Sequence, residues 1–103
     1  MKLSTDALLI GIAVLLAGNV QAASPYAGKT KAAAVCAQCH GMRMPATEAP
    51  FPFLGGRDVQ YLRLALRQYR DKTRLSPIMN NIAGSLSDRD IDDITAYYSG
   101  LKP

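Results

Sequence analysis

The two cysteines and the single histidine of this chain lie in one contiguous motif, Cys36-Ala37-Gln38-Cys39-His40. In a chain of 103 residues, this placement leaves few ways to stabilise a fold covalently. One disulfide at most can form, and a bridge between residues three apart closes a loop too short to constrain much of the unfolded chain. A disulfide within the motif would therefore add little to the stability of the fold, and something else should supplement its core.

The first residues have the three-part pattern of a secretory signal peptide. A short polar start with Lys2 is followed by an apolar run over residues 7–17, and small residues lead to a cleavage site after Ala22. A retained membrane anchor is the alternative, but the run is well short of the ~20 residues that span a bilayer. We expect residues 1–22 to be a cleaved signal peptide and residues 23–103 to form one domain, exported to the periplasm.

Three segments of the predicted domain have helical signals. Ser24, followed by a proline, predicts a helix over 25–37, because serine caps backbone N–H groups and proline is tolerated in the first turn. Apolar residues at helical spacing predict a second helix over 58–72, ended by a serine–proline pair. Ser87, with an aspartate three residues on, predicts a capping box and a third helix over 88–99. The expected buried face of this third helix comprises Ile91, Ile94, Tyr98 and, beside them, Tyr97. No alternating strand pattern is present, so we expect an all-α fold with three main helices.

The charged residues of the domain are segregated along the chain. Six basic residues crowd the segment 57–74, and four aspartates crowd the segment 88–93. The net charge of +4 does not by itself separate acidic protein partners, membrane surfaces and nucleic acid. On the second helix, Arg63, Arg67, Arg70 and Arg74 form a stripe. A stripe of this kind is a candidate docking surface for an acidic partner, although it is more often a solvated surface.

A long segment rich in proline and glycine, residues 41–56, separates the first two helices. Its prolines exclude a regular helix and argue against a central strand. Structureless loops of this length are unusual in so small a domain and usually surround something. A domain of about 81 residues also needs a staple beyond its apolar core, and a covalently held cofactor fits that need.

The C-x-x-C-H spacing is typical of covalent haem attachment. The thiols of Cys36 and Cys39 are spaced to add to the two vinyl groups of one haem, and His40 is placed beneath the iron as its proximal ligand. We therefore predict one covalent haem c. A redox C-x-x-C needs a βαβ context, and a zinc site needs a fourth ligand that no further Cys or His supplies. A plain disulfide leaves His40 and the proline-rich loop unexplained.

The second axial ligand of the iron can be sought by elimination. With one histidine, bis-histidine ligation is excluded, and methionine, lysine or an open position remain. Met42 and Met44 lie too close in sequence to His40 to reach the opposite face of the haem easily. Met79 lies in a turn-like stretch, residues 76–81, far enough along the chain to cross to that face. A methionine that only fills core space is the alternative, and we predict Met79 as the ligand.

At this point the sequence resembles the class I cytochromes c, and more closely their short bacterial members of the cytochrome c-4 and c-553 type. The resemblance covers nearly all of the predicted domain. It rests on Gly28, Cys-Ala-Gln-Cys-His-Gly at 36–41, Pro52-Phe53-Leu54-Gly55-Gly56, Tyr61-Leu62, Tyr69-Arg70, Arg74, Met79-Asn-Asn-Ile82-Ala83, Leu86-Ser87-Asp88 and Ala96-Tyr97-Tyr98. It implies that the first and last helices cross closely at Gly28, with the haem packed beneath them. It also implies that the Pro52 carbonyl accepts a hydrogen bond from the proximal histidine and that Met79 is the distal ligand.

Two departures from the family pattern stand near the haem edge. Residues 42–44, Met-Arg-Met, replace a common Asp-Gly, and Arg57 replaces a common glutamine. Arg57, Tyr61 and Arg74 are candidate partners of the haem propionates, with an ordinary solvated basic face as the alternative.

These features predict an electron carrier. Sulfur opposite histidine favours ferrous iron, and a six-coordinate iron leaves no position for a substrate, so we expect no enzyme activity. We expect redox protein partners, no nucleic acid, and membrane contact only through membrane-bound redox complexes. One alternative is a fixed haem subunit that serves as the electron inlet of a larger dehydrogenase or oxidase complex. Another is an enzyme or gas sensor, which requires that Met79 does not bind iron.

Overall fold

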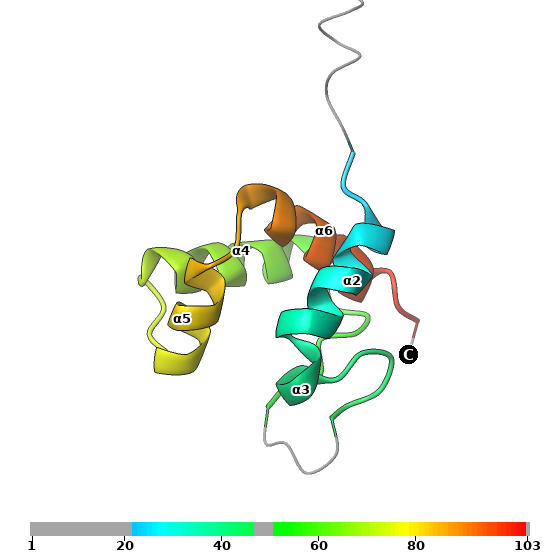
Figure 1. Ribbon diagram of the computed structural model, residues 1–103, viewed down its shortest axis with the longest axis horizontal. Coiled ribbons are helices and arrows are strands. Elements are labelled where there is room, and N and C mark those ends of the chain that lie inside the picture. Colours follow the sequence, from blue (N-terminus) through cyan, green and yellow to red (C-terminus); the bar gives the residue numbers. More distant parts are fainter. Residues whose placement is uncertain (1–21, 47–50, 103) are drawn as a thin grey trace, which may run out of the picture.

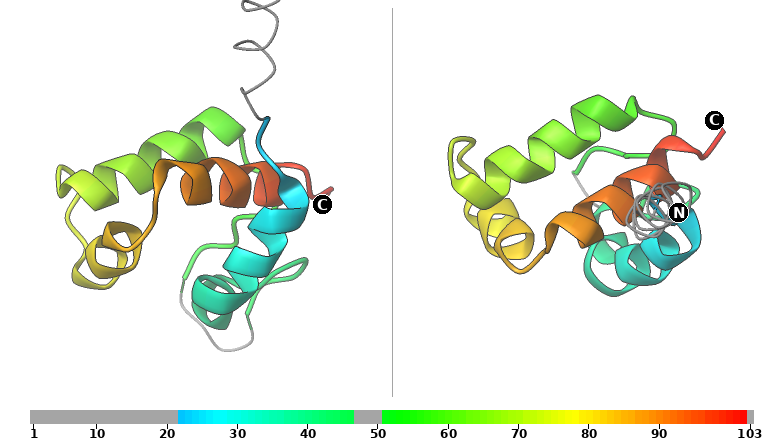
Figure 2. Two further views of the ribbon diagram at one scale, coloured as in Figure 1. Left: turned by 45° about the horizontal axis from the view of Figure 1, so that its top comes forward. Right: turned by 90° about the horizontal axis from the view of Figure 1, so that it is seen from above.

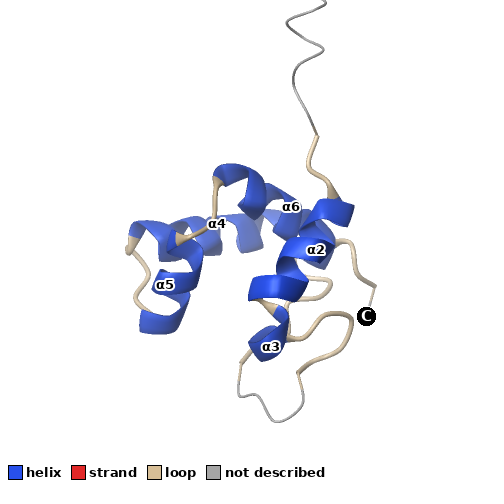
Figure 3. Cartoon of the chain, in the orientation of Figure 1, coloured by secondary structure: helices blue, strands red, loops and turns tan. Residues whose placement is uncertain are grey.

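The computed structural model describes residues 22–46 and 51–102. These residues form five helices: α2 (Pro25–Val35), α3 (Ala37–His40), α4 (Val59–Asp71), α5 (Pro77–Gly84) and α6 (Asp88–Ser99) (Figure 1). The described part of the chain contains no strand, which confirms the predicted all-α class (Figure 3). Residues 1–21 of the predicted signal peptide lie outside the described residues. Across the two described ranges, no helix is long and apolar enough to cross a membrane.

The expectation of a turn-like stretch at residues 76–81 is wrong, because this stretch forms most of helix α5. Its start has the same chemistry as the start of α2. The hydroxyl of Ser76 accepts a hydrogen bond from the Met79 N–H at 3.4 Å, and Pro77 occupies the first turn. The serine–proline pair therefore begins a short helix after the connection that follows α4. Met79 accordingly lies in the first turn of a helix.

Helices α2 and α6 cross at close range (Figure 2). A Cβ atom at Gly28 would lie 1.8 Å from the carbonyl oxygen of Asp93, so only glycine fits at this position. One turn further along α2, Ala32 is fully buried. Small side chains on α2 thus let the two backbones approach, as the family resemblance implies.

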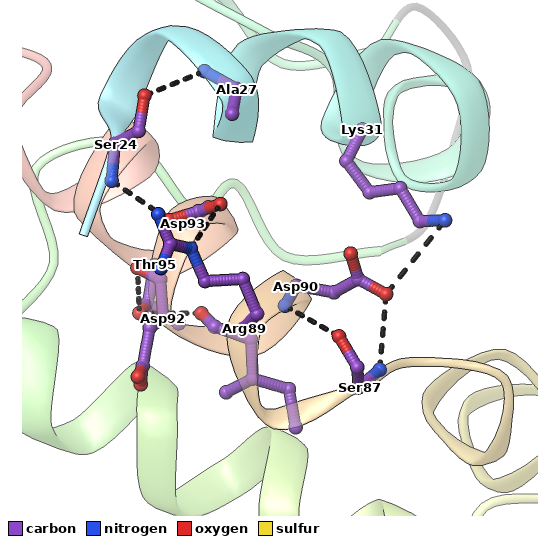
Figure 4. Close-up of polar contacts among 10 residues, drawn as sticks. Ser24, Ala27, Lys31, Ser87, Arg89, Asp90, Asp92, Asp93 and Thr95 are labelled. Carbon is purple, nitrogen blue, oxygen red and sulfur yellow. Dashed lines mark hydrogen bonds and ion pairs between the residues drawn. The ribbon is translucent and has the colours of Figure 1, made fainter. Parts of the chain in front are cut away.

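Polar contacts reinforce this crossing (Figure 4). The Asp93 carboxylate accepts a hydrogen bond from the Ser24 N–H at 2.7 Å, which ties the start of α2 to α6. At the start of α6, Ser87 and Asp90 form the predicted capping box, in which each side chain accepts from the other residue's N–H at 3.0 Å. Lys31 of α2 also lies 3.8 Å from Asp90. The starts of α2 and α6 are therefore capped by their own side chains and also joined by polar contacts to the other helix.

The core lies around α6, whose predicted buried face is confirmed. Ile91, Ile94, Tyr97 and Tyr98 are all buried, and they pack with Leu62 of α4, Leu86 and Ala32. Residues of α2, α4 and α6 thus meet in one cluster. Helix α5 packs against α4, away from the crossing of α2 and α6 (Figures 1 and 2).

The basic stripe of α4 faces the aspartates of α6. Arg70 Nη2 lies 2.7 Å from Asp88 Oδ1, and Arg63 Nε lies 3.1 Å from Asp92 Oδ1. The second pair is in ionic contact, although its geometry is not that of a hydrogen bond. Arg67 Nη2 is 3.9 Å from the same Asp92 oxygen. Three arginines of the predicted stripe are therefore paired within the chain, and the fourth, Arg74, lies beyond the end of α4. Both findings weaken the hypothesis that the stripe serves for docking.

Candidate haem site

A cavity of about 220 Å³ is lined by residues of all five helices and of the loop between α3 and α4. Protein interiors rarely contain voids larger than a water molecule, so a cavity of this size indicates a ligand site. Its walls are mainly apolar, with Val35, Leu54, Leu62, Leu66, Ile82, Leu86 and Ile94 among them. Every residue that the sequence analysis named as a candidate for the haem site lines this cavity: Cys36, Cys39, His40, Pro52, Arg57, Tyr61, Arg74 and Met79.

Cys36 lies at the break between α2 and α3, Cys39 lies within α3, and both are free thiols. Burial raises the pKa of the Cys36 thiol to about 11. A redox-active C-x-x-C motif needs the opposite shift, toward an accessible thiolate. Among the described residues, no group of three or more His, Cys, Asp or Glu side chains is arranged to hold a metal ion, which also argues against zinc.

The imidazole of His40 is oriented by the loop that follows it. Its Nδ1 lies 2.7 Å from the carbonyl oxygen of Pro52. A carbonyl can only accept a hydrogen bond, so Nδ1 carries the proton and Nε2 remains free as a ligand atom. A contact of this kind fixes the ring and raises its donor strength toward a metal.

Tyr98 supports the same loop and was missed as a site residue, although it was expected in the core. Its phenol donates a hydrogen bond to the Gly41 carbonyl at 2.6 Å, and its own carbonyl accepts from the Gly56 N–H at 2.8 Å. Burial raises the pKa of this phenol. The sequence signal was that a buried tyrosine needs a partner for its hydroxyl, but the partner itself was not predictable.

Met79 lines the cavity from α5, whereas His40 lines it from α3. In Figure 1 these two helices lie apart from each other, both below α4 and α6. The two residues predicted as axial ligands thus come from separate elements. By contrast, Met44 is 74 % exposed and does not line the cavity.

The two arginines that line the cavity are partly engaged with the chain itself. Arg57 Nε donates to the Phe53 carbonyl at 3.0 Å, and the Arg74 guanidinium lies 5.1 Å from the centroid of the Tyr69 ring. A hydrogen bond from Arg74, together with its charge, lowers the pKa of the Tyr61 phenol. Two cations and a phenol at one cavity suit a ligand with carboxylate groups.

This arrangement defines a class of protein. An all-helical domain whose apolar cavity has C-x-x-C-H on one wall and a methionine on another is built as a c-type haem protein. The residues fit the group: two free thiols for attachment, one free imidazole nitrogen, a thioether, and apolar walls.

Comparisons with known proteins agree with this class. No family model matches the sequence. The chain is 39% identical over 100 residues to the thiosulfate dehydrogenase electron acceptor of Stutzerimonas stutzeri (strain A1501), covering 90% of this chain and 46% of that protein. It is 39% identical over 67 residues to cytochrome c-554(548) of Halomonas halodenitrificans, covering 62% of this chain and 81% of that protein. The solved structure of Acidithiobacillus ferrooxidans cytochrome c4 matches with a TM-score of 0.66 and 28% identity, covering 81% of this chain and 52% of that one.

The chain belongs to the class I c-type cytochromes, and its cofactor is covalently bound haem c. It spans about half the length of the first of these relatives and of the cytochrome c4 structure.

Proposed function

We propose that this chain is a periplasmic electron carrier that transfers one electron at a time through a c-type haem. In this proposal, Cys36 and Cys39 attach the haem covalently, while His40 and Met79 bind its iron. The observation that carries the proposal is the position of His40 and Met79 on two separate helices around one apolar cavity. The contact of 2.7 Å from His40 Nδ1 to Pro52 supports it, because this contact leaves the other ring nitrogen free.

When bound, the haem supplies the reversible Fe(II)/Fe(III) couple. The protein's own contribution is to orient the imidazole of His40, to offer the thioether of Met79, and to exclude water with apolar walls. Ligation by the Met79 thioether together with the His40 imidazole would favour the ferrous state. If both residues bind the iron, no position would be left for a substrate, so the proposed role is carriage of electrons rather than catalysis.

Export supports this role. The predicted signal peptide, residues 1–22, would deliver the domain of residues 23–103 to the periplasm, and cytochromes of this family are generally periplasmic. Arg57, Tyr61 and Arg74 are proposed to contact the haem propionates, because all three line the cavity. We expect docking to redox proteins near this cavity rather than along α4, where Arg63, Arg67 and Arg70 are paired with aspartates of α6.

The alternative function is a fixed electron inlet in a larger dehydrogenase complex. It is favoured by the similarity to a protein named as the electron acceptor of thiosulfate dehydrogenase. Size-exclusion chromatography of the native protein from its host separates the two functions. A carrier elutes at the size of the single chain, whereas a subunit co-elutes with an enzyme.

The axial ligand is tested by replacing Met79 with alanine. The ferric holoprotein is expected to show a sulfur-to-iron charge-transfer band in the near infrared, and Met79→Ala should abolish it. Met44→Ala is the matched control, because Met44 is exposed and lies away from the cavity. If the band persists in Met79→Ala, Met79 is not the ligand and the proposed site is wrong.

A further inference from the structure

The side chain of Asn80 bridges the connection between α4 and α5. Its amide nitrogen donates to the carbonyl oxygens of Tyr69, at 2.8 Å, and Arg74, at 2.9 Å. Its amide oxygen accepts from the Ser76 N–H at 2.9 Å. A side-chain amide has two N–H donors and one carbonyl acceptor, so all of its polar groups are engaged. These three contacts are to backbone, and they join the end of one helix to the start of the next.

The connection that Asn80 closes is sharply bent. Helix α4 ends at Asp71, and the next residue, Lys72, has a φ of 64°, in the left-handed region that non-glycine residues rarely adopt. The chain then turns back so that α5 packs against α4. The Asn80 amide lies inside this turn and holds carbonyls from both of its arms. Without that amide, the position of α5 relative to α4 would depend on apolar contacts and on the helix caps alone.

Met79 and Asn80 use different faces of the first turn of α5. Successive residues of an α-helix project about 100° apart, at 3.6 residues per turn. Met79 lines the haem cavity, whereas Asn80 lies outside it, in a separate polar groove with Lys72, Pro77 and Asn81. The Asn80 amide therefore joins backbone groups of three residues of the cavity wall, Tyr69, Arg74 and Ser76, while its neighbour Met79 lines the cavity itself.

From this geometry we propose that Asn80 is a positioning residue that keeps the Met79 sulfur at the haem iron. The inference rests on the proposed ligation by Met79. A neutral thioether stays at a metal only if the helix that carries it stays in position. A contact that fixes α5 therefore determines how easily another ligand displaces the Met79 thioether. Loss of the two or three hydrogen bonds that fix this turn should ease displacement of the thioether by about tenfold or more.

The test is a titration of the ferric holoprotein with imidazole, followed by loss of the sulfur-to-iron band. Asn80→Ala should bind imidazole roughly tenfold or more tightly than the wild type, because the turn that fixes α5 loses up to three hydrogen bonds. Asn81→Ala is the matched control. Asn81 is exposed, lies in the same groove, and forms no side-chain hydrogen bond within the described residues, so its imidazole affinity should equal that of the wild type.

Thermal unfolding, measured on the same samples, separates positioning from a merely structural role. If Asn80→Ala lowers the melting temperature but leaves imidazole affinity at the wild-type value, the inference is overturned. Should the alanine variant fail to fold, Asn80→Asp decides by the same criterion, because aspartate keeps the acceptor for Ser76 and loses both donors. If the wild type lacks the band, Met79 is not the ligand and the inference fails with it. If the wild type has the band but the Asn80 variant has the same imidazole affinity, the inference alone is overturned.

Discussion

The phenol of Tyr98 donates a hydrogen bond of 2.6 Å to the carbonyl oxygen of Gly41, the residue that follows His40. Through its own backbone carbonyl, Tyr98 also accepts a hydrogen bond from the Gly56 N–H at 2.8 Å. One residue of α6 thus holds both ends of the loop that carries Pro52. Because Pro52 orients the imidazole of His40, the last helix of the chain contributes to the geometry of the site.

Tyr98→Phe should lower the free energy of unfolding by about 1–3 kcal/mol, because the Gly41 carbonyl would stay buried without its partner. Chemical denaturation of the holoprotein, followed by circular dichroism, measures this loss. The neighbouring Tyr97 provides the control. Its hydroxyl oxygen is buried without a hydrogen-bond partner in the described part of the chain, so Tyr97→Phe should be neutral or slightly stabilising. Equal losses in the two variants would contradict the assigned role of the Tyr98 hydroxyl.

Gly28→Ala should be strongly destabilising, by about 3 kcal/mol or more, because its Cβ would overlap the Asp93 carbonyl oxygen at 1.8 Å. The obstacle is backbone, so a side-chain rotation cannot relieve the overlap, and the two helices would have to separate. Gly84→Ala is the control, since a Cβ there has no neighbour within 4 Å. That variant should be neutral or more stable by about 0.5–1 kcal/mol, because alanine favours a helix. Urea midpoints measure both, and a mild effect of Gly28→Ala would show that the crossing tolerates separation.

Helix boundaries were predictable wherever they depend on local chemistry. Helix α6 has the predicted bounds, because the capping box at Ser87 and the glycine after Ser99 are readable over a few residues. Helix α5 was missed because a serine–proline pair signals the end of one helix and the start of another equally well. The asparagines that follow this pair are weak helix formers. The side chain of Asn80 also links α5 to Tyr69 and Arg74, which lie outside the helix, and no local pattern encodes these contacts.

The residues of the site likewise fall into those that a local pattern predicts and those that depend on the fold. Cys36, Cys39 and His40 are contiguous, so their chemistry could be recognised without a fold. The contact between Tyr98 and Gly41 spans 57 positions and depends on how α6 packs, which no local pattern encodes. The sequence likewise showed the basic and acidic segments but not that they face each other. The pairing of Arg70 with Asp88 became visible only when α4 and α6 were placed side by side.

Asp93 should stabilise the start of α2 mainly as a hydrogen-bond acceptor. The residue is 6% exposed, and its carboxylate accepts hydrogen bonds from the Ser24 N–H at 2.7 Å and from Arg89 Nε at 3.3 Å (Figure 4). Asp93→Ala should cost about 1–3 kcal/mol, whereas Asp93→Asn, which keeps an acceptor oxygen for Ser24, should cost clearly less. The contact with the half-exposed Arg89 contributes little by comparison. Thermal melts of the two variants check the order, and equal losses would assign the effect to the charge of Asp93.

The ion pair between Arg70 and Asp88 should make the stability of the protein depend on pH in the acid range. Arg70 Nη2 lies 2.7 Å from Asp88 Oδ1, and this hydrogen bond, together with the charge of Arg70, lowers the pKa of the Asp88 carboxyl. A carboxyl whose pKa is lower in the folded state stabilises the fold above its unfolded pKa of about 4. That stabilisation is lost as the pH falls through the folded pKa.

Wild type should therefore melt slightly above Asp88→Asn at neutral pH, and the difference should vanish in strong acid, where both side chains are neutral. Because Asp88 is exposed, the difference should be small and should shrink in high salt. Introducing Asp88→Asn into an Arg70→Gln background isolates the contribution of the ion pair. Asp88 also lies favourably in the first turn of α6, and that effect persists without Arg70. An acid-dependent difference of the same size in both backgrounds would show that the helix terminus, and not Arg70, is responsible.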